Sequence, residues 1–213
     1  MATRSLVAVS AGLQVPSSTR LLADRLVAAT ERHLRDSELD PVTTVIELRD
    51  HAQDLSKNLL TGFPSSTLQA AIDQVTGADG LIVASPIFNA SYSGLFKTFF
   101  DVIEHDSLDG RPVLLAATGG TARHSLALEH ALRPLFTYLG ADTVRTAVYA
   151  ASEDWGRSGV PADGSLVQRI DRAARELAAA MSVREPQTRH DAFNDPEPFE
   201  RMLRDLEPRQ SRD

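Results

Sequence analysis

Short apolar segments alternate along this chain with longer segments in which apolar residues recur at helical spacing. The apolar segments predict five strands, at Ser5–Ser10, Val42–Leu48, Gly80–Ala84, Pro112–Thr118 and Thr143–Ala150. The periodic segments predict five helices, at Ser18–Arg35, Ser65–Gly77, Gly94–His105, Ser125–Leu139 and Leu166–Val183. This alternation is typical of parallel βαβ units, which use right-handed crossovers. The chain is therefore expected to form an α/β fold.

The number of strands indicates a particular architecture. We expect a flavodoxin-like, doubly wound, five-stranded parallel sheet in the order 2-1-3-4-5, with helices on both faces. In that order the first, third and fourth strands end close together, so the loops that follow them should form one site. Pro134 should bend or break the fourth predicted helix.

Composition divides the chain into two parts. Residues 1–183 are predicted to form one domain, large enough to bury most of its apolar surface. Proline and charged residues dominate from residue 184 to residue 213, so this tail is expected to be extended or partly disordered. Within it, residues 199–206 could form two helical turns against a partner.

Charge and residue usage exclude several classes of function. The net charge of −7 argues against nucleic acid as a partner. The chain has no cysteine, which excludes disulfides, thiolate metal sites and cysteine nucleophiles. No apolar run approaches the roughly 18 residues that a membrane helix requires, and the N-terminus leaves no room for a signal peptide before the first strand. We therefore expect a cytoplasmic protein that binds neither nucleic acid nor membrane.

The loop after the first strand is rich in hydroxyl groups. Gly12 follows Ser10, and Ser17, Ser18 and Thr19 cluster where the first helix begins. One hydroxyl is enough to cap a helix, so three of them at a helix N-terminus favour an anion site over capping alone. Neither Gly-x-Gly-x-x-Gly nor a P-loop motif is present. A single phosphate held mostly by neutral donors is therefore the expected ligand of this loop.

Two further loops carry residues that suit a flat ligand. After the third strand, Pro86 stiffens the turn, Phe88 offers an apolar face and Asn89 a short polar arm. After the fourth strand, Gly119 and Gly120 would let the backbone approach a planar ring closely. An ordinary strand-to-helix turn is the alternative for this glycine pair.

These segments resemble the NAD(P)H-dependent FMN reductase family. Pro86-Ile87-Phe88-Asn89, followed by Ser91, Gly94 and Lys97, is similar to its isoalloxazine-binding loop, with Phe88 in place of the usual Tyr. The run from Ala117 to Ala141 is similar to the subgroup that serves two-component flavin-dependent monooxygenases. The resemblance implies FMN contacts from all three loops, at Ser10, Gly12, Ser17, Ser18, Thr19, Pro86, Ile87, Phe88, Asn89, Ser91, Thr118, Gly119, Gly120 and Thr121.

The same resemblance suggests roles for two histidines. His124 falls where the subgroup has a histidine close to the flavin edge, so it is a candidate catalytic residue; a solvent-facing residue or a subunit contact is the alternative. His130 falls where the subgroup widens this helix into a π-turn at a tetramer interface, and simple burial is the competing interpretation. The other histidines lack the spacing of metal ligands, and we expect no metal site.

The resemblance implies hydride transfer from NAD(P)H to FMN, with FMN released in reduced form to a partner monooxygenase. Such a transfer needs two stacked rings and little side-chain chemistry, in keeping with the absence of a nucleophile elbow or a zinc-protease motif. An NAD(P)H-dependent quinone or azo reductase with tightly bound FMN remains an alternative, as does a non-catalytic electron carrier. The sequence does not distinguish NADH from NADPH.

The helix predicted at Gly94–His105 carries apolar residues on more than one face, which indicates burial on several sides. The chain is expected to form a homodimer or tetramer, and our hypothesis is a dimer packed through this helix. Lys97 and Asp101 lie one turn apart and are expected to form an ion pair or a subunit contact.

Overall fold

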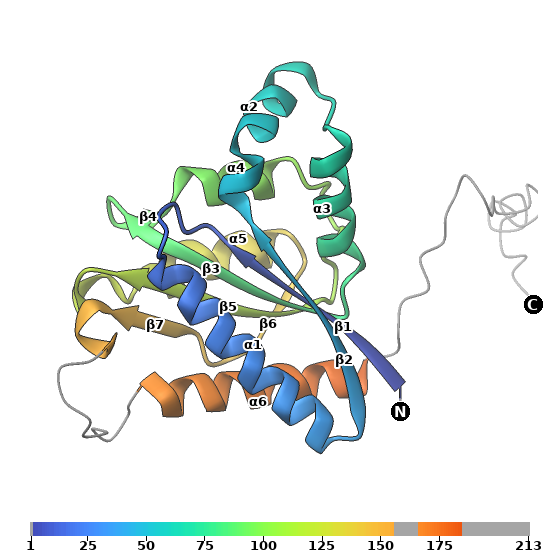
Figure 1. Cartoon of the computed structure of the whole chain (residues 1–213), viewed down its shortest axis with the longest axis vertical. Helices are drawn as coiled ribbons and strands as arrows, with labels where there is room; N and C mark the ends of the chain where they lie inside the picture. The colour runs from blue at the N-terminus through green and yellow to red at the C-terminus, as the bar shows by residue number, and fades with distance from the viewer. Residues whose placement is uncertain (1, 156–165, 185–213) are drawn as a thin grey trace, which may run out of the picture.

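The computed structural model describes residues 2–155 and 166–184 (Figure 1). Its sheet follows the order β2-β1-β3-β5-β6, in which all neighbouring strands are parallel. These strands are β1 (Ala2–Ser10), β2 (Leu39–Glu47), β3 (Gly80–Phe88), β5 (Pro112–Gly119) and β6 (Asp142–Thr143). The predicted order 2-1-3-4-5 and the flavodoxin-like fold class are confirmed, because β5 and β6 are the fourth and fifth strands of that prediction.

The fifth predicted strand, Thr143–Ala150, is divided in two. β6 and β7 (Val148–Ala151) pair separately with β5. Between them, Thr146 turns to Glu176 on the last helix, whose carboxylate accepts bonds of 2.7 Å from both the backbone N–H and the hydroxyl of Thr146. The strand is interrupted because the backbone N–H of Thr146 binds a side chain instead of extending the ladder to β5.

Helices cover both faces of the sheet (Figure 1). α1 (Ser18–Asp36) and α6 (Leu166–Val183) pack on one face. α3 (Ser66–Gly77), α4 (Gly94–Asp101) and α5 (Arg133–Tyr138) pack on the other. Successive side chains of a strand point to opposite faces, so in β1 Leu6 and Ala8 face α1 and α6, whereas Val7 and Val9 face the opposite layer.

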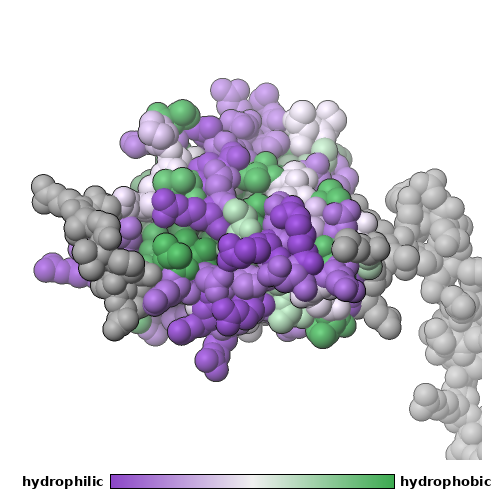
Figure 2. Space-filling model, turned by 60° about the horizontal axis from the view of Figure 1, so that its bottom comes forward, coloured by the Kyte–Doolittle hydropathy of each residue, from purple (hydrophilic) through white to green (hydrophobic). Residues whose placement is uncertain are grey.

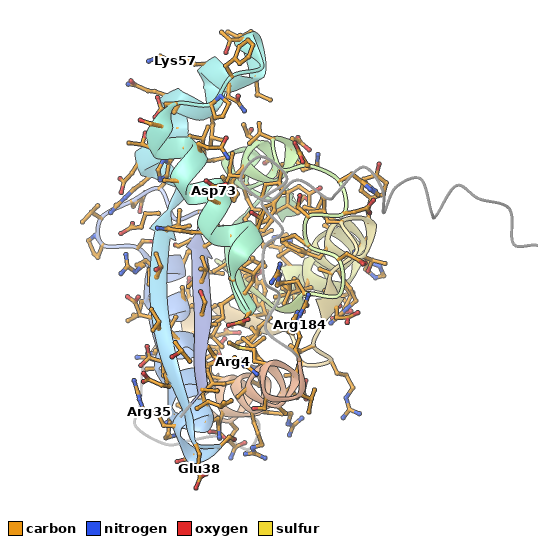
Figure 3. All side chains as sticks on the ribbon, turned by 90° about the vertical axis from the view of Figure 1, so that its right-hand side faces the viewer. Arg4, Arg35, Glu38, Lys57, Asp73 and Arg184 are labelled. Carbon is orange, nitrogen blue, oxygen red and sulfur yellow. The ribbon has the colours of Figure 1, made fainter. Side chains whose placement is uncertain are left out.

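A side chain from the first strand closes the end of the last helix. Arg4 is buried, and it donates from Nε to the carbonyl of Met181 at 3.0 Å and from Nη2 to that of Arg184 at 2.9 Å. Figure 3 shows Arg4 and Arg184 beside the C-terminal end of α6. These bonds satisfy carbonyls that the end of a helix leaves without partners.

One helix was not predicted. A 3₁₀ turn, η1 (Leu48–His51), leads into α2 (Ala52–Thr61), which ends at Gly62 in the left-handed conformation. Only Leu55 and Asn58 of α2 are buried, while Leu59 and Leu60 are exposed. Sequence reasoning missed this helix, which is ten residues long and buries two of them.

The helix predicted at Ser125–Leu139 is broken, as expected from Pro134. A 3₁₀ turn, η2 (Ala122–His124), precedes the π-helix η3 (Leu128–Leu132), and α5 follows with Pro134 in its first turn. The π-helix contains His130, at the position where the family resemblance implied a π-turn. His130 is exposed, so the interpretation of simple burial was wrong.

The aromatic residues of α4 are buried within the chain itself. Phe96, Phe99 and Phe100 are at most 2% exposed, and the rings of Phe96 and Phe100 lie 4.8 Å apart. The apolar character of several faces of this helix is therefore explained without a partner subunit, and an oligomer remains a prediction. Lys97 and Asp101 form the expected ion pair. Among the described residues, no helix is long and apolar enough to cross a membrane.

Candidate functional site

A cavity of about 880 Å³ lies at the carboxyl edge of the sheet, where β1, β3 and β5 end. All three predicted loops contribute to its wall, as expected for neighbouring parallel strands. The predicted residues that line it are Gly12, Ser17, Ser18, Thr19, Pro86, Ile87, Phe88, Thr118, Gly119 and Gly120.

The three hydroxyls that begin α1 have different surroundings. Ser17 caps the helix, since its Oγ accepts a bond of 3.2 Å from the backbone N–H of Arg20. Thr19 is buried, and its hydroxyl shares a bond of 2.7 Å with that of Thr118, which joins the first loop to the end of β5. Ser18 is exposed, and its hydroxyl has no partner in the described parts of the chain. Capping alone accounts for only one of the three.

Gly12 is required by the way this loop folds back on the helix. A Cβ atom at this position would overlap the Ser17 hydroxyl and approach Cβ of Thr19 to 3.3 Å. Only glycine therefore lets the loop pass so close to the start of α1.

The loop after β3 is a tight hairpin. β3 continues to Phe88 and pairs antiparallel with β4 (Ser91–Tyr92). The turn between them has two residues, Asn89 and Ala90, and both have a positive φ, 48° and 69°. The buried Ser85 hydroxyl accepts a bond of 3.0 Å from the N–H of Ser93 and donates to the carbonyl of Pro86. These bonds fix the base of the hairpin beside the cavity.

The two glycines after β5 have separate explanations. A Cβ on Gly119 would overlap the hydroxyl of Tyr149, which donates a bond of 2.8 Å to the carbonyl of Thr121. A Cβ on Gly120 would meet no atom within 4 Å. Gly119 is thus required by a neighbouring side chain, whereas Gly120 leaves open space at the cavity wall. Burial, and to a lesser extent the charge of Asp154, raises the pKa of Tyr149, so its phenol stays protonated as this bond requires.

Several predicted site residues lie elsewhere. Ser10 is buried beneath the first loop, with its hydroxyl 3.5 Å from the N–H of Gly12. Asn89, at the hairpin tip, and Thr121, beyond the glycine pair, do not line the cavity. Ser91 lines a different hollow, together with residues of α4 and α5. His124 is exposed in η2 and also lies outside the cavity lining.

The cavity also contains residues that sequence reasoning missed. The segment after β7 contributes Ser152 and Trp155, both in the 3₁₀ turn η4 (Ser152–Trp155), and α1 contributes Arg25. The guanidinium of Arg25 lies 5.1 Å from the centre of the Trp155 ring. Because β7 is parallel to β5, the residues that follow β7 reach the same edge of the sheet. The predicted parallel order of the strands could therefore have indicated that Ser152 and Trp155 lie at the site. The remaining additions are Leu13, Gln14, Pro16 and Leu21.

The cavity wall is nearly free of charge. Arg25 is the one ionisable side chain among the described residues that line it. Arg20, five residues before it on α1, is paired with Asp24 and Glu47 outside the cavity, and its hydrogen bond to Asp24 is the main cause of its raised pKa. No cluster of three or more histidine or acidic side chains able to hold a metal occurs in the described ranges. The arrangement suits a flat, uncharged ring with a phosphate at the start of α1, and contains no nucleophile–base pair.

Comparison with known proteins agrees with this geometry. The family model for NADPH-dependent FMN reductases matches residues 5–156. A FMN reductase (NADPH) of Pseudomonas aeruginosa is 42% identical over 174 residues, which are 81% of this chain and 90% of that protein. The NADH-dependent FMN reductase SfnF of Pseudomonas putida is 36% identical over 178 residues, 84% of this chain and 93% of that protein.

A solved structure shows the same relationship. An oxidoreductase from Corynebacterium diphtheriae is 41% identical and superimposes with a TM-score of 0.82, covering 87% of this chain and all of that one. Three findings lead to one conclusion: the family model matches more than half of the chain, the relatives are similar over nearly their whole length, and the fold is shared. The chain belongs to the NADPH-dependent FMN reductase family, and it is an oxidoreductase that uses FMN and NAD(P)H.

Proposed function

We propose that the cavity at the carboxyl edge of the sheet binds FMN, and that the enzyme releases reduced FMN to a partner flavin-dependent monooxygenase. The observation that carries the proposal is the meeting of a helix N-terminus and an open, glycine-lined wall in one nearly uncharged hollow. The first suits a phosphate and the second a planar ring.

The start of α1 fits the phosphate. Its free backbone N–H groups and the positive end of its dipole attract an anion. Thr19 is bonded to Thr118 within the fold and Ser17 accepts the capping bond, so Ser18 is the hydroxyl of the three that has no partner among the described residues. No cationic side chain is needed at this end, which agrees with the pairing of Arg20 outside the cavity.

The opposite wall fits the isoalloxazine ring. Pro86, Ile87 and Phe88 present apolar surface along the end of β3, and Gly120 presents backbone without a side chain. Phe88 is 46% exposed, so covering it with a ring would remove apolar surface from water.

The protein's contribution to the reaction is orientation. Bound FMN supplies the hydride acceptor, and the chain needs only to hold two rings face to face and exclude water from between them. The described lining has no carboxylate, histidine or lysine that could act as an acid or base. His124 lies outside it, so replacement of His124 by Ala is expected to leave kcat nearly unchanged.

Release of FMN is supported by the small number of charged contacts. A phosphate held by neutral donors is bound less tightly than one held by charge-assisted bonds. Such a site suits a flavin that is exchanged in each catalytic cycle and passed to an oxygenase.

The test compares NADPH oxidation with and without added FMN, after gel filtration has removed loosely held flavin. We expect activity to depend on added FMN, and reduced FMN to pass an ultrafiltration membrane after anaerobic reaction with NADPH. Flavin that stays with the protein, combined with faster turnover of a quinone than of free FMN, would instead identify a quinone reductase.

A further inference from the structure

A second hollow, of about 810 Å³, lies between α1 and α6. Four arginines from the two helices line it: Arg25, Arg32, Arg172 and Arg175. Figure 2 brings the underside of the view in Figure 1 forward and shows hydrophilic surface across the middle of this side of the molecule. We call this hollow the arginine groove.

The arginine groove has an excess of positive charge. Asp171 is the one carboxylate in its described lining, and it accepts bonds of 2.7 Å from Arg32, 2.6 Å from Arg175 and 2.9 Å from His33. Partial burial acts to raise the pKa of Asp171, but these hydrogen bonds outweigh it and the pKa is lowered, so the carboxylate stays ionised. One negative charge therefore faces four guanidinium groups, in a chain whose net charge is −7.

Two of the four arginines have no carboxylate partner. Arg172 forms no ion pair within the described ranges, and Arg25 stacks on Trp155 instead of pairing with an acid. The lining also includes the exposed side chain of Val167 and the largely buried Ile170. Unpaired guanidinium groups beside apolar surface suit a ligand that combines phosphate groups with a flat base, since arginine binds phosphate through paired donors and stacks on planar rings.

The arginine groove adjoins the cavity described above, because Arg25 lines both. The position of the groove beside the cavity matters because the cavity lining has too little positive charge for the phosphate groups of NADPH. NADPH carries a pyrophosphate and a 2′-phosphate, yet Arg25 is the one cation in the described lining of the cavity. The neighbouring groove holds the positive charge that the cavity lacks.

We propose that the arginine groove binds the phosphorylated adenosine half of NADPH, with Arg25 at the junction and Arg172 on the 2′-phosphate. The proposal rests on the function proposed above, and it makes NADPH the preferred hydride donor. The relatives do not decide this point, since one is named for NADPH and another for NADH.

The test is the charge reversal Arg172→Glu in the full-length protein, assayed with saturating FMN and either NADPH or NADH. Arg172 is exposed and unpaired in the described structure, so the fold should tolerate the change. We expect the KM for NADPH to rise about tenfold or more, the loss of one charge-assisted contact, with kcat and the KM for NADH nearly unchanged. The matched control is Arg35→Glu, on the same side of the sheet but outside the groove, which should alter neither KM.

A second measurement uses adenosine 2′,5′-bisphosphate as the probe. It should inhibit wild-type turnover competitively against NADPH, and Arg172→Glu should weaken this inhibition while leaving FMN titration unchanged. The proposal is overturned if the KM values for NADPH and NADH change equally or not at all; in the latter case the groove serves another anion, such as an acidic polypeptide. Failure of the proposed function is recognised separately, because the wild-type protein would then fail to reduce FMN with either nucleotide.

Discussion

The two ends of the cavity are built in different ways. At the start of α1, Ser17 caps the helix and Thr19 is bonded to Thr118, so the loop is held by interactions within the fold. At the end of β3, the wall is formed by Pro86, Ile87 and the exposed Phe88, just before the two-residue turn of the hairpin. The first end is organised before any ligand arrives, whereas the second offers surface that a ligand would cover. The phosphate end should therefore be sensitive to changes in packing, and the ring end to changes in shape.

Gly12→Ala should have the largest effect, because it disrupts the preorganised end. The new methyl group would overlap the Ser17 hydroxyl and crowd Thr19, and overpacking of this kind costs about 1–3 kcal/mol. Both the free energy of unfolding, measured in urea, and the affinity for FMN, measured by quenching of flavin fluorescence, should fall. Unchanged FMN affinity would show that this loop is not part of the flavin site.

Gly120→Val should weaken FMN binding without affecting stability. A Cβ atom at this position would meet no protein atom within 4 Å, so the added side chain starts in open space and acts mainly on a ligand in the cavity. We expect the Kd for FMN to rise about tenfold, or about 1.4 kcal/mol, while the urea midpoint stays constant. Wild-type affinity in this variant would place the ring elsewhere.

Ser17→Ala and Ser18→Ala should separate capping from ligand binding. Loss of the Ser17 cap should reduce stability by about 1 kcal/mol. Loss of the exposed Ser18 hydroxyl should leave stability unchanged and raise the Kd for FMN severalfold, because one neutral hydrogen bond contributes about 0.5–1.5 kcal/mol. Equal effects of the two substitutions on both measurements would contradict this division.

Ala90→Gly should have the smallest effect. Ala90 has a φ of 69°, a conformation that costs an L-residue roughly 1 kcal/mol. Glycine removes that strain but makes the unfolded chain more flexible. We therefore expect the free energy of unfolding, measured by thermal denaturation, to rise by less than about 1 kcal/mol. FMN affinity should be unaffected, since Ala90 does not line the cavity. A marked loss of affinity would show that the hairpin tip contacts the ligand.

Features encoded by neighbouring residues were predictable from the sequence, and those decided by distant contacts were not. The alternation of strands and helices and the broken helix around Pro134 follow from local pattern, and the strand order follows from the fold class that this alternation indicates. The division of the fifth strand depends on Glu176, thirty residues away from Thr146. The different roles of Gly119 and Gly120 depend on Tyr149, which no spacing in the glycine loop reveals. The same holds for the contact between Arg25 and Trp155, which forms because the segment after β7 returns to the same edge of the sheet.

The bond between the Thr19 and Thr118 hydroxyls joins positions 99 residues apart. Neither half of the polypeptide can assemble this pocket alone, so flavin should recognise only chains whose folding is complete. A ligand that binds the folded chain and not the unfolded chain raises the fraction of folded protein by mass action. Added FMN would then stabilise the folded enzyme as well as take part in its turnover.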